Sequence, residues 1–195
     1  MTRSKIRTSG AEGLTLSSTS LTVANGLTLT DGDIAFADGH GLNFASASGD
    51  ASGMASELLD DYEEGTFTAA FAAASGTVTI SDSFKTGVYT RIGSVVTFTL
   101  HARVGSTDGS NSGNLTITGL PFTTPNDNKY RHTIGVMAFF TLTGMTNLEL
   151  PFAYLSSNSS TISLAITNTN NLQALNANRV TTNSEFYITG SYQIT

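Results

Sequence analysis

The sequence contains no cysteine, so neither a disulfide framework nor a thiolate metal site can stabilise the fold. It also lacks any run of the roughly 20 apolar residues that a membrane-spanning helix needs. The basic residues at the start, Arg3, Lys5 and Arg7, are not followed by the apolar core of a signal peptide. We therefore expect no disulfide-stabilised domain and no membrane insertion.

Charged residues are few and unevenly placed. Only 12% of the 195 residues are charged, and the net charge is -6. After Arg7, no lysine or arginine follows until Lys85, and the carboxylates in between make this stretch acidic. Nucleic acid requires a continuous basic surface, so we expect no nucleic-acid partner. The basic start is consistent with docking on an acidic partner and equally with a frayed, solubilising terminus.

Threonine, serine, asparagine and glycine are abundant instead. Serine and asparagine compete with the helix backbone and threonine is stiff at χ1, so this composition disfavours helices. The same residues suit strands joined by tight turns. The composition therefore predicts an all-β fold, and the length fits either one ordinary domain with an extension or one large all-β domain.

Short apolar triplets recur before residue 45. Each forms a three-residue strand with two apolar side chains on one face, followed by a turn. Such a ladder cannot bury its apolar face alone, so other copies of the chain must cover it. We predict that residues 1–56 form an attachment segment, a thin β-repeat shaft and a small-residue linker. The residues predicted to join the copies are Leu14, Leu16, Leu21, Val23, Leu27, Leu29, Ile34, Phe36, Leu42, Phe44, Leu58 and Leu59.

The number of chains is not fixed by these residues alone. A trimer is the usual arrangement of fibrous β shafts, and we therefore expect a homotrimer.

The stretch 57–67 separates this thin part from a head domain at residues 57–195. Leu58, Leu59 and Tyr62 have the spacing of one helix face, and Gly65 is a plausible helix stop. The sequence thus predicts a short helical joint. The other sides of this helix would carry Glu57, Asp60, Asp61, Glu63 and Glu64.

The remaining chain reads as strands. The clearest signal is the alternation from Val96 to Val104, which places apolar side chains on one face and polar ones on the other. The loop at 105–113 has no apolar residue and is expected to lie in solvent. The pattern predicts an antiparallel β-sandwich, like a jelly roll. The expected strands are 66–73, 77–81, 88–92, 96–104, 115–120, 132–143, 148–154, 161–167 and 185–194.

Four motifs carry a resemblance to a known family. They lie, in this order, at residues 59–67, 87–96, 113–122 and 186–192, and the resemblance that they carry covers roughly residues 57–195. The set resembles the C-terminal head domain of appendage proteins of tailed bacteriophages, notably tail fibres of marine phages. The resemblance implies a homotrimeric structural protein on the surface of the phage particle.

Two functions are compatible with this resemblance. The first is a short fibre that attaches to other virion proteins through its N-terminal segment and contacts the host receptor, a surface glycan or protein, with its head. The alternative is a capsid decoration protein, or head fibre, that stabilises the shell.

Catalytic chemistry has little support in the sequence. His40, His101 and His132 fall in no metal-ligand spacing, and no nucleophile, nucleotide or metalloprotease motif is present. A polysaccharide hydrolase needs two carboxylates facing one cleft, whereas Glu63, Glu64 and their neighbours crowd one short segment. We expect no enzyme activity and no cofactor.

The acidic turns leave open whether the protein binds a divalent cation. Asp31, Asp33, Asp38 and the carboxylates of residues 57–67 would be repeated around the axis of an oligomer, where Ca²⁺ or Mg²⁺ could neutralise them. The alternative is that these residues serve only turn formation and solubility.

Receptor contacts are expected from exposed tyrosines and from the polar loop. Tyrosine can stack on a sugar while its hydroxyl stays hydrated, although it also packs on sheet faces. The candidate residues are Tyr89, Tyr130, Arg131, Tyr187, Asp108 and Asn111.

Overall fold

The computed structural model describes residues 33–43, 58–59, 61–129, 132–145, 149–168 and 171–194. The chain divides into two units, Met1–Ala35 and Phe36–Thr195. Most of the predicted shaft and linker, including Phe44 and every apolar triplet before Ile34, lies outside the described residues. Within the second unit, β1 (Leu42–Asn43) pairs antiparallel with β2 (Leu58–Leu59). The predicted shaft and the boundary at residue 56 stay predictions.

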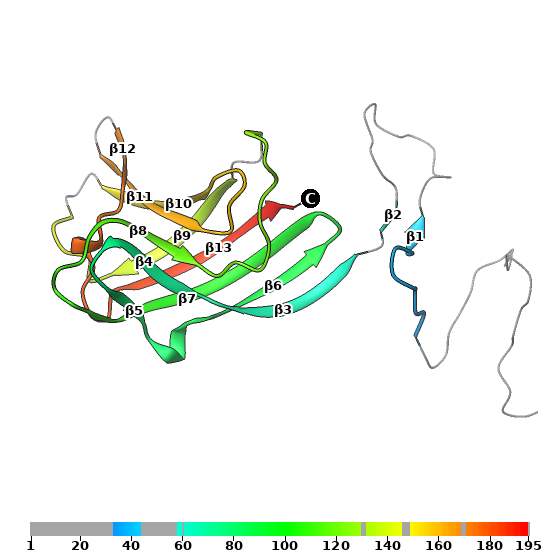
Figure 1. The fold of residues 1–195 in the computed structure, drawn as a ribbon, viewed down its shortest axis with the longest axis horizontal. Helices are drawn as coiled ribbons and strands as arrows, with labels where there is room; N and C mark the ends of the chain where they lie inside the picture. The colour runs from blue at the N-terminus through cyan, green and yellow to red at the C-terminus, as the bar shows by residue number, and fades with distance from the viewer. Residues whose placement is uncertain are drawn as a thin grey trace, which may run out of the picture. The chain divides into compact units, whose positions relative to one another are not determined.

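Residues 62–194 form an antiparallel β-sandwich of two sheets (Figure 1). This confirms the predicted fold class of the head. The first sheet has the order β3 (Tyr62–Thr68), β6 (Thr86–Ile92), β7 (Val95–Thr107), β13 (Glu185–Gln193) and β9 (His132–Phe140). The second has the order β9, β10 (Leu150–Leu155), β11 (Ile162–Asn168), β8 (Ser112–Thr118) and β4 (Ala70–Ser75). Two short strands complete them: β5 (Val78–Ile80) pairs with β7, and β12 (Asn171–Ala174) pairs with β11.

The two sheets are linked along both edges. On one side β9 belongs to both, because Ile134 pairs with β10 while Gly135 already pairs with β13. On the other side the chain passes directly from β3 to β4 through Ala69, whose N–H donates to the Lys85 carbonyl at 2.7 Å. Gly119 lies against this crossing with a φ of +104°, and a β-carbon there would collide with the Thr68 carbonyl oxygen. The crossing therefore needs glycine at this position.

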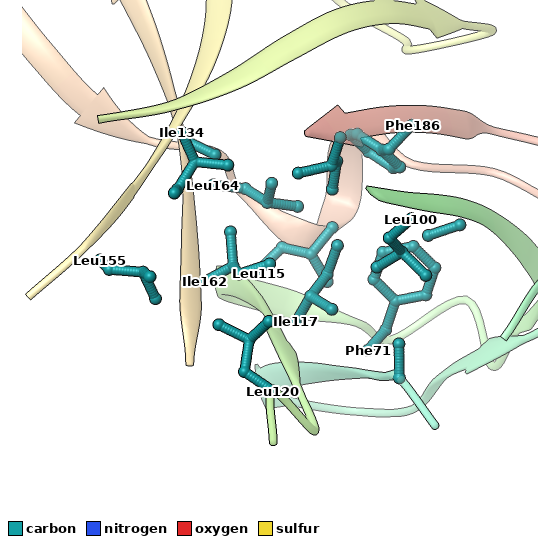
Figure 2. Close-up of a cluster of buried hydrophobic side chains, with 14 of the residues drawn as sticks. Phe71, Leu100, Leu115, Ile117, Leu120, Ile134, Leu155, Ile162, Leu164 and Phe186 are labelled. Carbon is teal, nitrogen blue, oxygen red and sulfur yellow. The ribbon is translucent and has the colours of Figure 1, made fainter. Parts of the chain in front are cut away.

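The core lies between the sheets and follows the predicted alternation. Along β7, the predicted apolar face from Val96 to Val104 is buried, and along β13 Phe186, Ile188 and Tyr192 are buried. Figure 2 shows how Phe71, Leu100 and Phe186 from three strands converge with the aliphatic residues of the second sheet. Within the first sheet, ring centroids are 6.1 Å apart for Phe67–Phe98 and 6.0 Å apart for Phe98–Tyr192. The pair Phe71–Phe186, at 5.7 Å, connects the two sheets.

The predicted helical joint is wrong in the described residues. Tyr62–Thr68 is strand β3, which pairs with β6 over its full length and buries Phe67 in the core. Gly65 does not end a helix, since it lies within β3 beneath Tyr89, whose hydroxyl would be 2.6 Å from an added β-carbon. Leu59 is in β2, and Glu57 and Asp60 lie outside the described residues. Pairing with a strand some 25 residues further on outweighs the local helical spacing.

The loop at 105–113 also differs from the prediction. Strand β7 continues to Thr107 by pairing with β5, and β8 begins at Ser112. The difference is in secondary structure at the two ends of the loop, since Ser106, Asp108, Gly109, Ser110 and Ser112 are exposed as predicted. Two short 3₁₀ helices, η1 (Asp82–Phe84) and η2 (Ala177–Arg179), complete the fold. Neither these nor any other helix in the described ranges has the length and apolar character to cross a membrane.

Candidate functional site

The outer face of the first sheet presents side chains in rows that run across the strands. The registers of β3, β6, β7 and β13 place these residues directly opposite one another. The first row is apolar at three of its four positions, the middle rows are rich in threonine, and the last two rows carry aromatic and charged groups. In order, the rows are Tyr62–Ile92–Val95–Gln193, Glu64–Thr90–Thr97–Ser191, Thr66–Val88–Thr99–Thr189, His101–Tyr187 and Arg103–Glu185.

The middle rows line an open groove of about 530 Å³. Its polar side chains are mainly short hydroxyls. Two of the lining residues contact β13 beside the groove: Thr97 Oγ1 and Ser191 Oγ are 2.8 Å apart, and Thr189 Oγ1 donates to the Phe98 carbonyl at 3.1 Å. The groove offers hydroxyl groups and methyl groups with a single carboxylate. Its lining is Glu64, Gly65, Thr66, Val88, Tyr89, Thr90, Thr97, Phe98 and Thr99.

The last rows form a compact cluster of Phe84, His101, Arg103, Glu185 and Tyr187, called here the aromatic-charged cluster. The His101 and Tyr187 rings stack with centroids 4.1 Å apart and planes inclined by 20°. Phe84 of η1 meets the His101 ring edge-on at 4.6 Å, and the Arg103 guanidinium lies 5.3 Å from the Phe84 centroid. Aromatic rings from three separate elements, η1, β7 and β13, thus cover one end of the sheet.

Glu185 holds the cluster together. One of its oxygens, Oε2, is 3.3 Å from His101 Nε2 and accepts the Tyr187 hydroxyl at 3.1 Å, while the other is 3.4 Å from Arg103 Nε. The hydrogen bond to Glu185 raises the pKa of Tyr187 from its ordinary value. The cluster therefore presents a fixed, partly exposed tyrosine ring beside a guanidinium and a carboxylate. Such a surface suits a ligand with both an apolar face and polar groups.

Two of the predicted receptor residues have contrasting positions in the sheet. Tyr187 is exposed on the outer face, as predicted. Tyr89 is half-buried: its hydroxyl donates to Glu63 Oε1, and its ring meets Phe122 edge-on at 5.6 Å. Tyr89 therefore packs against the core, which is the alternative that the sequence left open. Tyr130 and Arg131 lie outside the described residues.

The other two predicted receptor residues belong to the β7–β8 turn. Asn111 is buried and donates from Nδ2 to the Ala177 carbonyl, so its predicted exposure in solvent is wrong. Asp108 is exposed, but its carboxylate accepts the Ser110 N–H at 2.9 Å and the Thr77 N–H at 2.6 Å. Both side chains connect the turn to neighbouring segments.

These hydrogen bonds predict a pH dependence. The Ser110 N–H, followed by that of Thr77, lowers the pKa of Asp108 from the ordinary 3.8. A lowered folded-state pKa means that the carboxylate stabilises the fold above pH 3.8 and that this contribution is lost as the pH falls through the folded-state pKa. We expect the wild type to lose more thermal stability than Asp108→Asn between pH 5 and about pH 3, measured by circular dichroism. Equal losses in both proteins would contradict this assignment.

The residues predicted to join copies are exposed wherever the structure describes their side chains. Ile34, Phe36, Leu42 and Leu59 all leave large apolar surface uncovered in the single chain. Leu58 belongs to β2. The remaining members, Leu14, Leu16, Leu21, Val23, Leu27, Leu29 and Phe44, lie outside the described residues.

The carboxylates of residues 61–64 are engaged with separate partners. Asp61 accepts a hydrogen bond from Arg91 at 2.7 Å, Glu64 accepts the Tyr62 hydroxyl at 2.5 Å, and Glu63 accepts that of Tyr89. Over the described ranges, no three histidine or acidic side chains are grouped closely enough to hold a metal ion. A cation at Asp31 or between subunits stays an open prediction.

Sequence reasoning missed Phe84, Arg103 and Glu185 as members of the cluster. Alternation does place His101 with Arg103, and Glu185 with Tyr187, on the polar faces of their strands. What alternation cannot give is the pairing of β7 with β13, which joins residues more than 80 positions apart.

Comparison with known proteins gives a likeness of fold. No protein-family model and no curated protein matches the sequence. Among solved structures, the Dettilon tailspike protein is similar, with a TM-score of 0.58 and 23% sequence identity over 68% of this chain. The match spans 24% of that tailspike, so this chain is similar to about a quarter of a larger protein. The β-sandwich of this chain is thus a fold that also occurs within a phage tailspike.

Proposed function

We propose that this chain is a non-enzymatic surface protein of a tailed-bacteriophage particle, a short trimeric fibre whose head contacts the host receptor. The observation that carries the proposal is the likeness of the β-sandwich to part of a phage tailspike. The four motifs that resemble the head domain of phage appendage proteins point in the same direction. The sandwich is the head, and the N-terminal segment attaches to other virion proteins.

Exposed apolar residues support assembly of several copies. Ile34, Phe36 and Leu42 lie in a segment with no core of its own, and each leaves half or more of its surface uncovered. Burying such side chains is worth roughly 1.5–3 kcal/mol each. Neighbouring copies that supply the missing cover would account for the recurring triplets.

The aromatic-charged cluster is the proposed receptor contact. It combines an exposed tyrosine ring with charged groups of both signs, and the groove beside it offers hydroxyls. A glycan or a protein loop with mixed polarity fits this surface.

The absence of catalysis is part of the proposal. Glu63 and Glu64 are consecutive residues of β3, so their side chains leave opposite faces of the sheet. Each is held by a different tyrosine hydroxyl. This arrangement does not bring an acid and a nucleophile to one cleft, as glycoside hydrolysis requires.

The test uses the purified full chain. Sedimentation equilibrium is expected to give three times the chain mass of 20.4 kDa. Fluorescently labelled protein is expected to bind certain strains in a panel of bacteria, and Tyr187→Ala is expected to weaken that binding at least about tenfold, the effect of losing a central aromatic contact. Tyr62→Ala, which removes an exposed tyrosine of the first row at the other end of the outer face, is the matched control.

Three outcomes would contradict parts of the proposal. A monomer would exclude the trimeric fibre. Unchanged binding by Tyr187→Ala would exclude the cluster as the receptor contact. Release of the protein from particles with loss of shell stability, and no binding to any strain, would favour capsid decoration instead.

A further inference from the structure

The outer face of the second sheet differs sharply from that of the first. None of the strands β4, β8, β10, β11 and β12 contains an aspartate, glutamate, lysine or arginine. We infer that this uncharged face is the surface through which copies of the head contact one another. The inference rests on the proposed trimer and specifies which surface of the head it uses.

The register of the second sheet shows what the face presents. Its inward side chains fill the core, so the alternate residues point outward. Leu150 and Leu172 flank Thr167 in one row and are 67% and 58% exposed. The next row joins Phe152, Ala165 and Ala174, of which Ala165 is already buried in the single chain.

The rest of the face is polar through hydroxyl groups and through the amide of Asn114, an exposed residue of β8 two positions before Thr116. Ala72, Thr116, Ser163 and Tyr154 lie opposite one another across four strands. The Phe152 and Tyr154 rings are 6.4 Å apart along β10. Small side chains let another sheet approach closely, and aromatic rings with leucines supply buried area. Burial of these side chains does not require a charged group to lose its hydration.

The choice of a second copy as partner follows from symmetry and from tethering. Rotational symmetry repeats every charge around its axis, so like charges near the axis repel one another. The first sheet exposes Glu64, Arg103 and Glu185, whereas the second sheet brings no charge to the axis. Association of the apolar N-terminal segments would hold the heads at an effective concentration on the order of millimolar. At that concentration, even a weak contact between the uncharged faces would keep the heads together.

The absence of cysteine allows a direct test on the full chain. Leu172→Cys reports on the uncharged face, and Val88→Cys reports on the outer face of the first sheet. The two positions are 58% and 54% exposed in the single chain, so a monomer would be labelled at similar rates at both. In the assembled protein, we expect a maleimide to label Leu172→Cys at least about tenfold more slowly than Val88→Cys.

A charge introduced on the face gives a second readout. Leu150→Lys would repeat a positive charge in every copy, and we expect it to weaken association at least about tenfold in sedimentation equilibrium. Val88→Lys, the matched control, is expected to leave association unchanged. Circular dichroism melts of both variants verify that the head is folded.

The outcomes separate the inference from the proposed function. A trimer in which the thiol of Leu172→Cys is protected supports both. A trimer in which Leu172→Cys and Val88→Cys are labelled equally fast overturns the inference and leaves the proposed trimer intact. A wild-type monomer overturns both.

Discussion

Replacing Phe98 with alanine is expected to lower the free energy of unfolding by about 3–5 kcal/mol, as for other buried phenylalanines. Phe98 of β7 is fully buried between Phe67 of β3 and Tyr192 of β13. Removing its ring leaves a cavity and deprives both neighbours of an edge-to-face contact. Because folded domains are stable by only about 5–15 kcal/mol, this loss is a large fraction of the total.

The measurement is chemical denaturation at one fixed protein concentration, since association would otherwise alter the apparent stability. Tyr192→Phe is the control, because it keeps the ring that contacts Phe98 and removes only a hydroxyl. Burial raises the pKa of Tyr192 to about 12, and the hydroxyl has no hydrogen-bond partner of good geometry in the described part of the chain. Its removal is expected to change stability by less than about 1 kcal/mol. A loss below about 1 kcal/mol for Phe98→Ala would contradict the central role of this ring.

Gly119→Ala is expected to be the second most damaging change, lowering the free energy of unfolding by more than about 3 kcal/mol through a backbone cost and a steric collision together. The left-handed backbone costs an L-residue about 1–2 kcal/mol by itself. At Gly119 the added methyl group also collides with the Thr68 carbonyl at the crossing between the sheets. Relief of this collision would have to move the backbone that links β3 to β4.

Gly93→Ala separates the two causes. Gly93 has a φ of +56°, but a β-carbon there meets no atom within 4 Å. It should therefore show the backbone cost alone, about 1–2 kcal/mol. Thermal unfolding of both variants, followed by circular dichroism, gives the comparison, and equal losses would exclude the collision as a cause.

The head domain was predictable because alternation is a local property. The pattern of apolar and polar residues in β7 and β13 reports directly which side chains face the core. The antiparallel sandwich follows from several such strands with turn residues between them. The order of the strands does not follow, since it depends on contacts between residues far apart in sequence.

The errors of the sequence interpretation also arise from contacts between residues that are far apart in sequence. Residues 57–67 have a helical spacing of apolar side chains, yet β3 forms because β6 offers a complete set of backbone partners. Asn111 is polar and follows a serine and a glycine, yet it is buried because η2 presents a carbonyl to it. Strand β12 is short and has no strong strand residues, and pairing with β11 stabilises it.

The candidate site was only partly predictable for a further reason. Tyr187 was identified as an exposed aromatic residue. The sequence does not show, however, which other side chains lie on the same face of the sheet as a given tyrosine. Tyr89 looked equivalent, and Gly65 opposite it leaves room for its ring to lie inward. The aromatic-charged cluster requires β7, β13 and η1 to meet, which only the folded chain reveals.

The first row of the outer face shows that both chain ends of the sandwich lie at the same pole. Tyr62, where the sandwich begins, and Gln193, near its last strand residue, lie in the same row, so the polypeptide enters and leaves at one pole. Arg103 and Glu185 lie in the last row, at the opposite pole. A sandwich immobilised at Tyr62 or Gln193 would therefore hold that opposite pole outward, free to meet whatever it encounters.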